Sequence, residues 1–180
     1  MRRAGIPLDD ADREHWDYTP FTNIGPLRFG MTHDQVVAAL GGASAITQLG
    51  GHSPAGHAGD HWAQFYEVAV TTYYGNSETL SGVAIDALHG PQVTIGGIRL
   101  VGRVPSELAR EFVDYAVSRG VSAVYSQQGD PGADELGLVL RAQRAGDILL
   151  TRPVFVTREW ADGVSDTSEG SVPQVEWLKR

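Results

Sequence analysis

The residues whose chemistry is most suggestive of a reactive or metal-binding site lie together in one glycine-rich loop. His52, His57, Asp60 and His61 place three imidazoles and one carboxylate within ten residues of the chain. Such groups bind zinc or nickel, and a histidine oriented by a carboxylate can act as a general base. Metal ligands usually lie on rigid elements, however, and this composition is typical of a polar surface loop. We therefore predict no metal and no cofactor, and keep a metal-binding protein or a hydrolase using this loop as the alternative.

Other catalytic patterns are missing from the sequence. It contains no Gly-x-Ser-x-Gly motif, no His-Glu-x-x-His motif and no phosphate-binding loop ending in Gly-Lys-Ser/Thr. Glu107, Glu111 and Asp114 have helical spacing, which is also the spacing of a solvated polar helix face. We therefore predict that the protein is not an enzyme.

Composition restricts the class of partner. The net charge of −8 argues against nucleic acid and against an anionic membrane, and it favours a basic protein as partner. No stretch approaches the length of apolar sequence that spans a membrane, and no apolar run of signal-peptide length follows the two initial arginines. The chain has no cysteine, which excludes disulfides and thiolate metal sites. We expect a cytoplasmic protein.

The clearest local structural signal is a short amphipathic helix that begins after Thr32. Thr32 and Gln35 have the spacing of a capping box, and Gly41 supplies a helix stop. Val36 and Leu40 form an apolar stripe that must pack on another element, because so short a helix is marginal alone.

Strand patterns follow this helix, and a second helix with more strands follows them. Alternating residues predict one strand over 64–74, and a second strand is predicted over 80–87. In the second half, a Gly-Gly hairpin precedes a helix that starts near Pro105, with Ser106 as its possible cap, and ends at Gly120. The remaining strands are predicted at 121–125, 136–142 and 148–156.

The motif Gly30-Met31-Thr32, with Gln35-Val36 and Leu40-Gly41 and the aromatic strands after it, resembles BamE/SmpA-type modules. It is also similar to the repeat unit of the beta-lactamase inhibitory protein (BLIP). These resemblances imply a helical pair on an antiparallel sheet, an inhibitor or assembly role, and a protein partner. The cysteines of a BLIP unit and the lipoprotein signal of BamE are absent from this sequence.

We therefore predict an α+β fold of two tandem helix-plus-antiparallel-sheet units of the BamE/BLIP type, possibly sharing one continuous sheet. The ranges are a leader at 1–22, a first unit at 23–90, a second unit at 91–160 and a tail at 161–180.

Aromatic residues indicate where a partner would bind. Trp62, Phe65, Tyr73 and Tyr125 are expected on the sheet face away from the helices. Aromatic side chains on an open face often mark protein-binding surfaces, although ordinary cross-strand packing explains them too. The sequence thus favours a non-catalytic protein-binding module, an inhibitor or immunity-type protein that neutralises a partner enzyme or toxin. A third hypothesis is that the protein is a structural subunit of a larger assembly.

Overall fold

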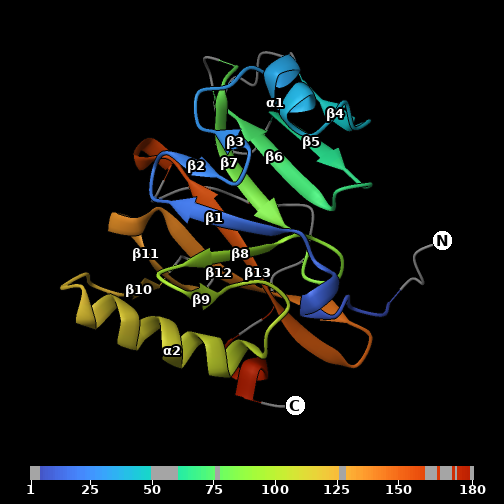
Figure 1. The fold of residues 1–180 in the computed structure, drawn as a ribbon. Coiled ribbons are helices and arrows are strands. Elements are labelled where there is room, and N and C mark those ends of the chain that lie inside the picture. The colour runs from blue at the N-terminus through green and yellow to red at the C-terminus, as the bar shows by residue number, and fades with distance from the viewer. Residues whose placement is uncertain are drawn as a thin grey trace.

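The fold is taken from a computed structural model, and the structure describes residues 5–49, 61–75, 78–125, 129–160, 166, 172 and 174–178. Within these residues the chain forms a large sheet, a small sheet and two α-helices (Figure 1). The strands of the large sheet are β4 (Ile46–Gln48), β5 (His61–Phe65), β6 (Val70–Tyr74), β7 (Leu80–Ile85), β10 (Val124–Tyr125), β11 (Pro131–Ala133), β12 (Leu138–Ala145) and β13 (Ile148–Val156). Those of the small sheet are β1 (His15–Thr19), β2 (Asn23–Ile24), β3 (Leu27–Arg28), β8 (Gln92–Ile95) and β9 (Ile98–Arg99). The helices are α1 (His33–Ala39) and α2 (Pro105–Ser118), and the short 3-10 helices are η1 (Asp10–Asp12), η2 (Asp134–Leu136), η3 (Arg158–Trp160) and η4 (Gln174–Leu178).

The large sheet has the strand order β10-β11-β12-β13-β7-β6-β5-β4, and its neighbouring strands run antiparallel. The small sheet has the order β3-β2-β1-β8-β9, and β1 and β8 in it are parallel. The two sheets therefore both combine strands from the first and second halves of the chain.

This arrangement corrects the predicted fold class. The described residues are rich in strands and form an α+β fold only in the broad sense, not two tandem helix-plus-sheet units of the BamE/BLIP type. The reason lies in β7 and β13. Every side chain of β7 is buried, and the last seven of β13 are buried, so neither strand can form an outer edge. The two strands pair with each other, with Val154 opposite Ala84, and the predicted ranges 23–90 and 91–160 share one sheet.

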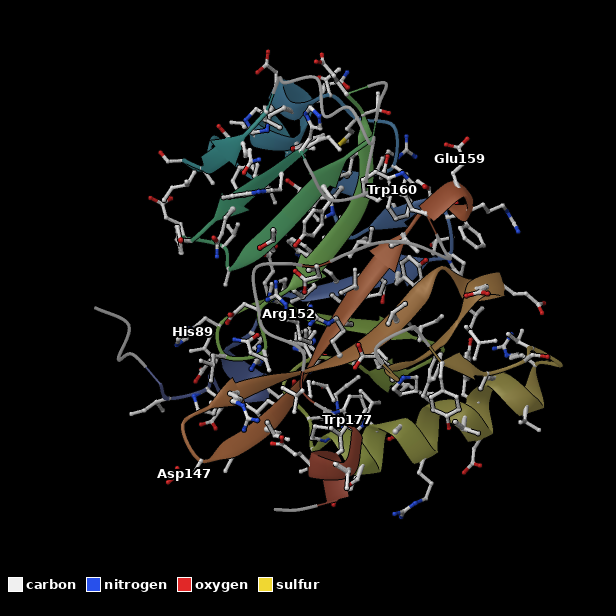
Figure 2. All side chains as sticks on the ribbon, turned by 180° about the vertical axis from the view of Figure 1, so that it is seen from behind. His89, Asp147, Arg152, Glu159, Trp160 and Trp177 are labelled. Carbon is white, nitrogen blue, oxygen red and sulfur yellow. The ribbon has the colours of Figure 1, made fainter. Side chains whose placement is uncertain are left out.

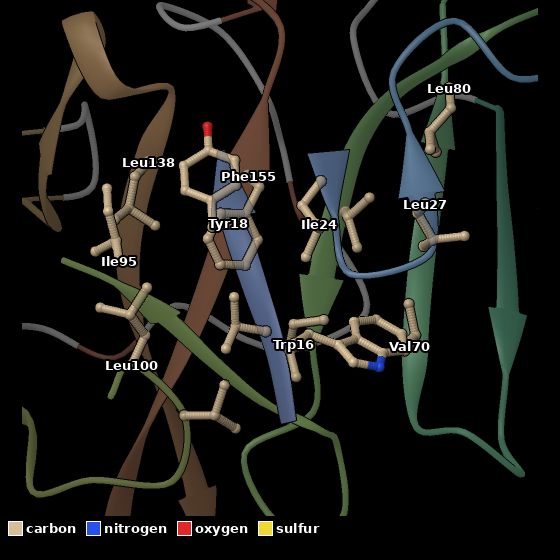
Figure 3. Close-up of a cluster of buried hydrophobic side chains, with 14 of the residues drawn as sticks. Trp16, Tyr18, Ile24, Leu27, Val70, Leu80, Ile95, Leu100, Leu138 and Phe155 are labelled. Atoms are coloured by element: carbon tan, nitrogen blue, oxygen red, sulfur yellow. The ribbon is translucent and has the colours of Figure 1, made fainter. Parts of the chain in front are cut away.

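The main core lies between the large sheet and the elements that cover one of its faces. Trp16, Tyr18 and Ile24 of the small sheet meet Val70 and Phe155 of the large sheet there (Figure 3). The rings of Tyr18 and Phe155 have centroids 4.5 Å apart. Both helices add buried side chains to the same cluster, so α1, the small sheet and α2 all cover this face.

Helix α1 forms as the sequence predicts. The backbone N–H of Gln35 donates to Thr32 Oγ1 at 3.3 Å, and the N–H of Thr32 donates to Gln35 Oε1 at 3.0 Å, which completes the capping box. At the other end, the N–H groups of Gly41 and Gly42 donate to carbonyls of the last turn, with Gly41 in the left-handed region at φ +71°. Val36 is fully buried and attaches the helix to the core.

Helix α2 is also close to the prediction. Pro105 opens it, and Leu108, Phe112 and Ala116 form its buried face. The predicted cap at Ser106 is wrong, because Val104 is the N-cap and makes no side-chain cap bond. A proline at the first helical position has no N–H that needs a cap, so this start is tolerated.

The single strand predicted over 64–74 is wrong. The chain turns over residues 66–69, so that β5 and β6 form a hairpin with Phe65 opposite Val70. Ala69 has a φ of +56°, in the left-handed region that glycine usually supplies. The turn therefore lacks the residue types that signal one in a sequence, and the apolar alternation continues across it.

Candidate functional site

The four aromatic residues predicted to bind a partner do not lie on one surface. Trp62 and Tyr73 are opposite each other on β5 and β6, on the face of the large sheet away from α1 and α2. Tyr73 is buried and Trp62 partly buried. Phe65 points to the other face and is fully buried in the main core. Tyr125 is exposed, but it lies on β10, at the opposite end of the sheet from β4 and β5. The structure brings together only Trp62 and Tyr73.

The far face of the large sheet is partly covered by the chain itself. Trp160 in η3 packs with Tyr73, Val154 and Val156 on this face (Figure 2). Asp166, beyond η3 in the chain, accepts a hydrogen bond from the Tyr73 hydroxyl. The expectation that this face would be open is therefore corrected at Tyr73.

Three donors converge on the carboxylate of Asp166 on this face. Arg152 donates to it from Nε, 2.7 Å from Oδ2, and from Nη2, 3.2 Å from Oδ1. Arg141 donates from Nη1 to Oδ2 at 2.8 Å and to the backbone carbonyl of Asp166 at 2.6 Å. The Tyr73 hydroxyl donates to Oδ1. We call Asp166, Arg141, Arg152 and Tyr73 the Asp166 cluster.

A second group of side chains holds the two guanidinium groups in place. Asp130 Oδ2 lies 3.6 Å from Arg141 Nε and forms an ion pair with it. Gln143 Oε1 accepts a bond from Arg152 Nη1 at 3.4 Å, and Gln143 Nε2 donates to Asp86 Oδ2 at 2.9 Å. The arginines are therefore oriented by residues of the sheet as well as by Asp166.

The charges in the Asp166 cluster reinforce one another. Burial by itself raises the pKa of Asp166, but the charge and hydrogen bonds of Arg152, followed by the charge of Arg141, hold that pKa well below its usual range. Burial also lowers the pKa of Arg152, and the charge of Asp166 more than offsets this, so that the pKa of Arg152 is raised. Asp166 is therefore ionised at neutral pH.

The Asp166 cluster has the geometry of an anchor rather than of a reaction centre. The side chain of Asp166 has no exposed surface, and that of Arg152 is 3% exposed, so neither is accessible to a substrate. The sequence analysis did not identify these residues. A usable signal was present, because Arg141 and Arg152 lie inside strands that also carry many apolar residues, and a buried arginine requires an anionic or hydrogen-bonding partner.

Of the four residues named in the histidine loop, the structure describes His61. His52, His57 and Asp60 lie outside the described residues. His61 lies on β5 opposite Tyr74 and is partly exposed. Among the residues that the structure describes, no three His, Asp or Glu side chains are grouped so as to hold a metal ion.

His33 belongs to a second polar group, at the start of α1. Its Nδ1 lies 3.0 Å from the hydroxyl of Tyr74, which in turn lies 3.1 Å from Thr72 Oγ1. Burial, offset in part by the Thr72 bond, raises the pKa of Tyr74 to about 12. A phenol that keeps its proton at neutral pH and is buried does not act as a base, so this group ties α1 to β6.

The described part of the largest run of sequence without charge lies at one end of the molecule. No Asp, Glu, Lys or Arg occurs over residues 35–59. The described part of this run forms most of α1 and all of β4, which lie next to β5 at the top of Figure 1. The exposed residues here, with Tyr66 from the adjacent turn, are called the neutral tip; they are Gln35, Ala38, Gly41, Gly42, Ser44, Ile46, Thr47, Gln48, Leu49 and Tyr66.

Strand β4 gives the neutral tip an exposed edge. It pairs with β5 on one side, with Ile46 opposite Gln64, and ends the large sheet, so that no described strand pairs with its other side. All three residues of β4 are exposed, and Ile46 is 57% exposed. An edge strand without charged side chains is a site where a second polypeptide can bind.

Comparisons with known proteins do not place the chain in a family. It matches no family model, no curated protein and no solved structure. In the part of the chain that the structure describes, neither helix is long and apolar enough to cross a membrane.

Proposed function

We propose that the protein is a non-catalytic protein-binding module, an inhibitor or immunity-type protein that neutralises a partner enzyme or toxin. The proposal places its binding surface at the neutral tip instead of at the four aromatic residues predicted from the sequence. It also places the protein in the cytoplasm, where a chain without cysteine needs no disulfide.

The observation that carries this proposal is the absence of charge from an exposed surface. About one residue in five of the whole chain is charged, yet residues 35–59 contain no charged residue. The exposed residues in and next to α1 and β4 combine apolar and amide side chains, among them Ile46, Leu49 and Gln48. The centres of protein–protein interfaces are depleted of charged residues in the same way. Exposed Asp34 and Glu67 border the neutral tip, as polar residues border the centre of a protein–protein interface.

The acidic residues outside the neutral tip would attract a basic partner over long range. The net charge of the chain is −8, and the neutral tip contributes no charge to it. A basic partner would therefore be steered toward the protein by the acidic body and would bury the uncharged surface on contact. This division predicts that added salt slows association more than it speeds dissociation.

The proposal is tested with the products of the neighbouring genes. Each purified product is titrated against the protein by calorimetry, and any enzymatic or toxic activity is measured with and without the protein. We expect one basic product to bind with a dissociation constant of about 1 μM or tighter. We expect its activity to fall in proportion to the amount of protein added.

Two matched variants locate the surface. Ile46→Glu places a charge at the centre of the neutral tip and is expected to weaken binding by at least about tenfold. Ile148→Glu is the control, because Ile148 is also exposed, at 47%, and lies at the start of β13. The proposal fails if no neighbouring product binds, and the location fails if both variants weaken binding equally.

A further inference from the structure

The donors around Asp166 belong to three strands of the large sheet. Arg141 and Arg152 are directly opposite each other on β12 and β13, and Tyr73 lies on β6. Arg152 is labelled at the centre of the far face in Figure 2. Asp166, the acceptor, lies in no described strand or helix. The anion thus comes from a separate part of the chain, and the groups that bind it come from the sheet.

Bonds to residues other than Asp166 also hold these donors in place. Arg141 is paired with Asp130, and Arg152 is bonded to Gln143. Both arginines are nearly buried, so their side chains have little room to reorient. A guanidinium group binds a carboxylate through parallel N–H donors in a fixed geometry, which the Nε and Nη2 atoms of Arg152 already provide.

The charge balance specifies the ligand. The two guanidinium groups carry two positive charges; Asp130 forms an ion pair with Arg141, and the charge of Asp86 also acts on Arg152. Without the carboxylate of Asp166, Arg152 would lose the ion pair that it makes at 2.7 Å, and breaking a buried ion pair is strongly unfavourable. A monoanion with two oxygens in one plane would restore both the charge balance and the hydrogen bonds.

We infer that Arg141, Arg152 and Tyr73 form a carboxylate-binding site on the sheet, which Asp166 fills from within the chain. The site takes a small monocarboxylate, such as formate or acetate, when the Asp166 carboxylate is removed. Formate is the stricter probe because it is little larger than the carboxylate group that it replaces.

In the wild-type protein Asp166 competes with any external carboxylate. A ligand tethered to the same chain acts at an effective concentration of millimolar or higher. A free monocarboxylate at millimolar concentration is therefore not expected to displace it, and the wild-type protein serves as the filled control.

The test uses full-length Asp166→Ala and measures thermal unfolding in formate. We expect the variant to melt below the wild type in sodium chloride, and its melting temperature to rise by about 3 °C or more as sodium formate replaces chloride at constant ionic strength. The wild type should show no such rise, because its site is full. The double variant Asp166→Ala, Arg152→Met should show no rise either, because one half of the site is gone.

Each outcome decides the question. Formate that stabilises Asp166→Ala, but neither the wild type nor the double variant, supports the site. Equal stabilisation of all three proteins, or of none, overturns it. If Asp166→Ala is unfolded in chloride, circular dichroism across a formate series replaces the melting curve: refolding by formate supports the inference, and its absence overturns it.

Discussion

Arg141 and Arg152 lie directly opposite each other on β12 and β13, and both donate to the same oxygen, Oδ2 of Asp166, at 2.8 and 2.7 Å. Like charges at opposed positions of a sheet repel each other. These two arginines are also almost fully buried, which increases the repulsion. The Asp166 carboxylate forms an ion pair with both arginines and so offsets their repulsion. The stability of the β12–β13 hairpin therefore depends on a residue outside it.

Replacing Asp166 with Asn should therefore destabilise the protein strongly. The side chain keeps its shape but loses its charge, so Arg152 loses the buried carboxylate that it binds and Arg141 keeps only its ion pair with Asp130 among the pairs described above. We expect the free energy of unfolding, measured by urea denaturation at pH 7, to fall by about 3 kcal/mol or more. Glu176→Gln is the control, since Glu176 forms an exposed ion pair with Arg144, and its loss should change stability by less than about 1 kcal/mol. Similar losses for the two variants would contradict a special role for the buried pair.

The Asp166 cluster also predicts how stability changes in acid. The pKa of Asp166 is lowered in the folded protein, whereas an unfolded aspartate has a pKa of about 3.9. The unfolded state therefore takes up a proton first, and the stabilisation is present above about pH 4 and is lost as the pH falls below it. The difference in unfolding free energy between the wild type and Asp166→Asn should shrink as urea titrations move from pH 5 to pH 3. A constant difference over this range would show that folding does not lower the pKa of Asp166.

Local signals explain which parts of the fold were predictable. The capping box at Thr32, the proline that opens α2 and the Gly-Gly hairpin before it depend on residues close together in sequence, and the structure confirms all three. The turn between β5 and β6 was missed because its left-handed residue is Ala69, not glycine. The sequence did not establish that strands from the ranges 23–90 and 91–160 form one sheet, because the pairing of β7 with β13 joins residues far apart in sequence.

The candidate sites were less predictable, for a related reason. Arg152 and Asp166 are only 14 residues apart, but Asp166 lies in the range predicted as a tail, 161–180, and nothing in the residue types of that range specifies which residue contacts the sheet. A buried arginine indicates that a partner exists without indicating which of the 22 acidic residues of the chain it is.

Tyr74 should make the protein less stable in alkali. Its pKa is about 12 in the folded protein, because burial raises it, against about 10 in an unfolded chain. The unfolded state therefore loses the proton first, and stability declines as the pH rises from about 10 to 12. Tyr74→Phe should lose about 1 kcal/mol at neutral pH with the bonds to His33 and Thr72, and should show a weaker alkaline decline.

Absorbance at alkaline pH measures the ionisation of this phenol directly. The difference between the wild-type and Tyr74→Phe titration curves isolates one phenol, and its midpoint should lie near pH 12 as long as both proteins remain folded. A midpoint near 10 would mean that the Tyr74 hydroxyl is open to solvent and that the link between α1 and β6 is looser than described.

Alanine substitutions at Gly25 and Gly41 distinguish the cost of backbone strain from the cost of a steric clash. Both adopt left-handed backbone conformations, with φ of +53° and +71°. A Cβ atom added at Gly25 would lie 2.4 Å from Cγ of the buried Trp16, whereas one added at Gly41 would meet nothing within 4 Å. Gly41→Ala should therefore lower the unfolding free energy by about 1 kcal/mol from backbone strain alone. Gly25→Ala should lower it by about 1–3 kcal/mol more, because the Trp16 indole must move within a packed core. Equal losses in urea denaturation would show that the indole shifts freely, and would contradict the close packing of β1 against the turn between β2 and β3.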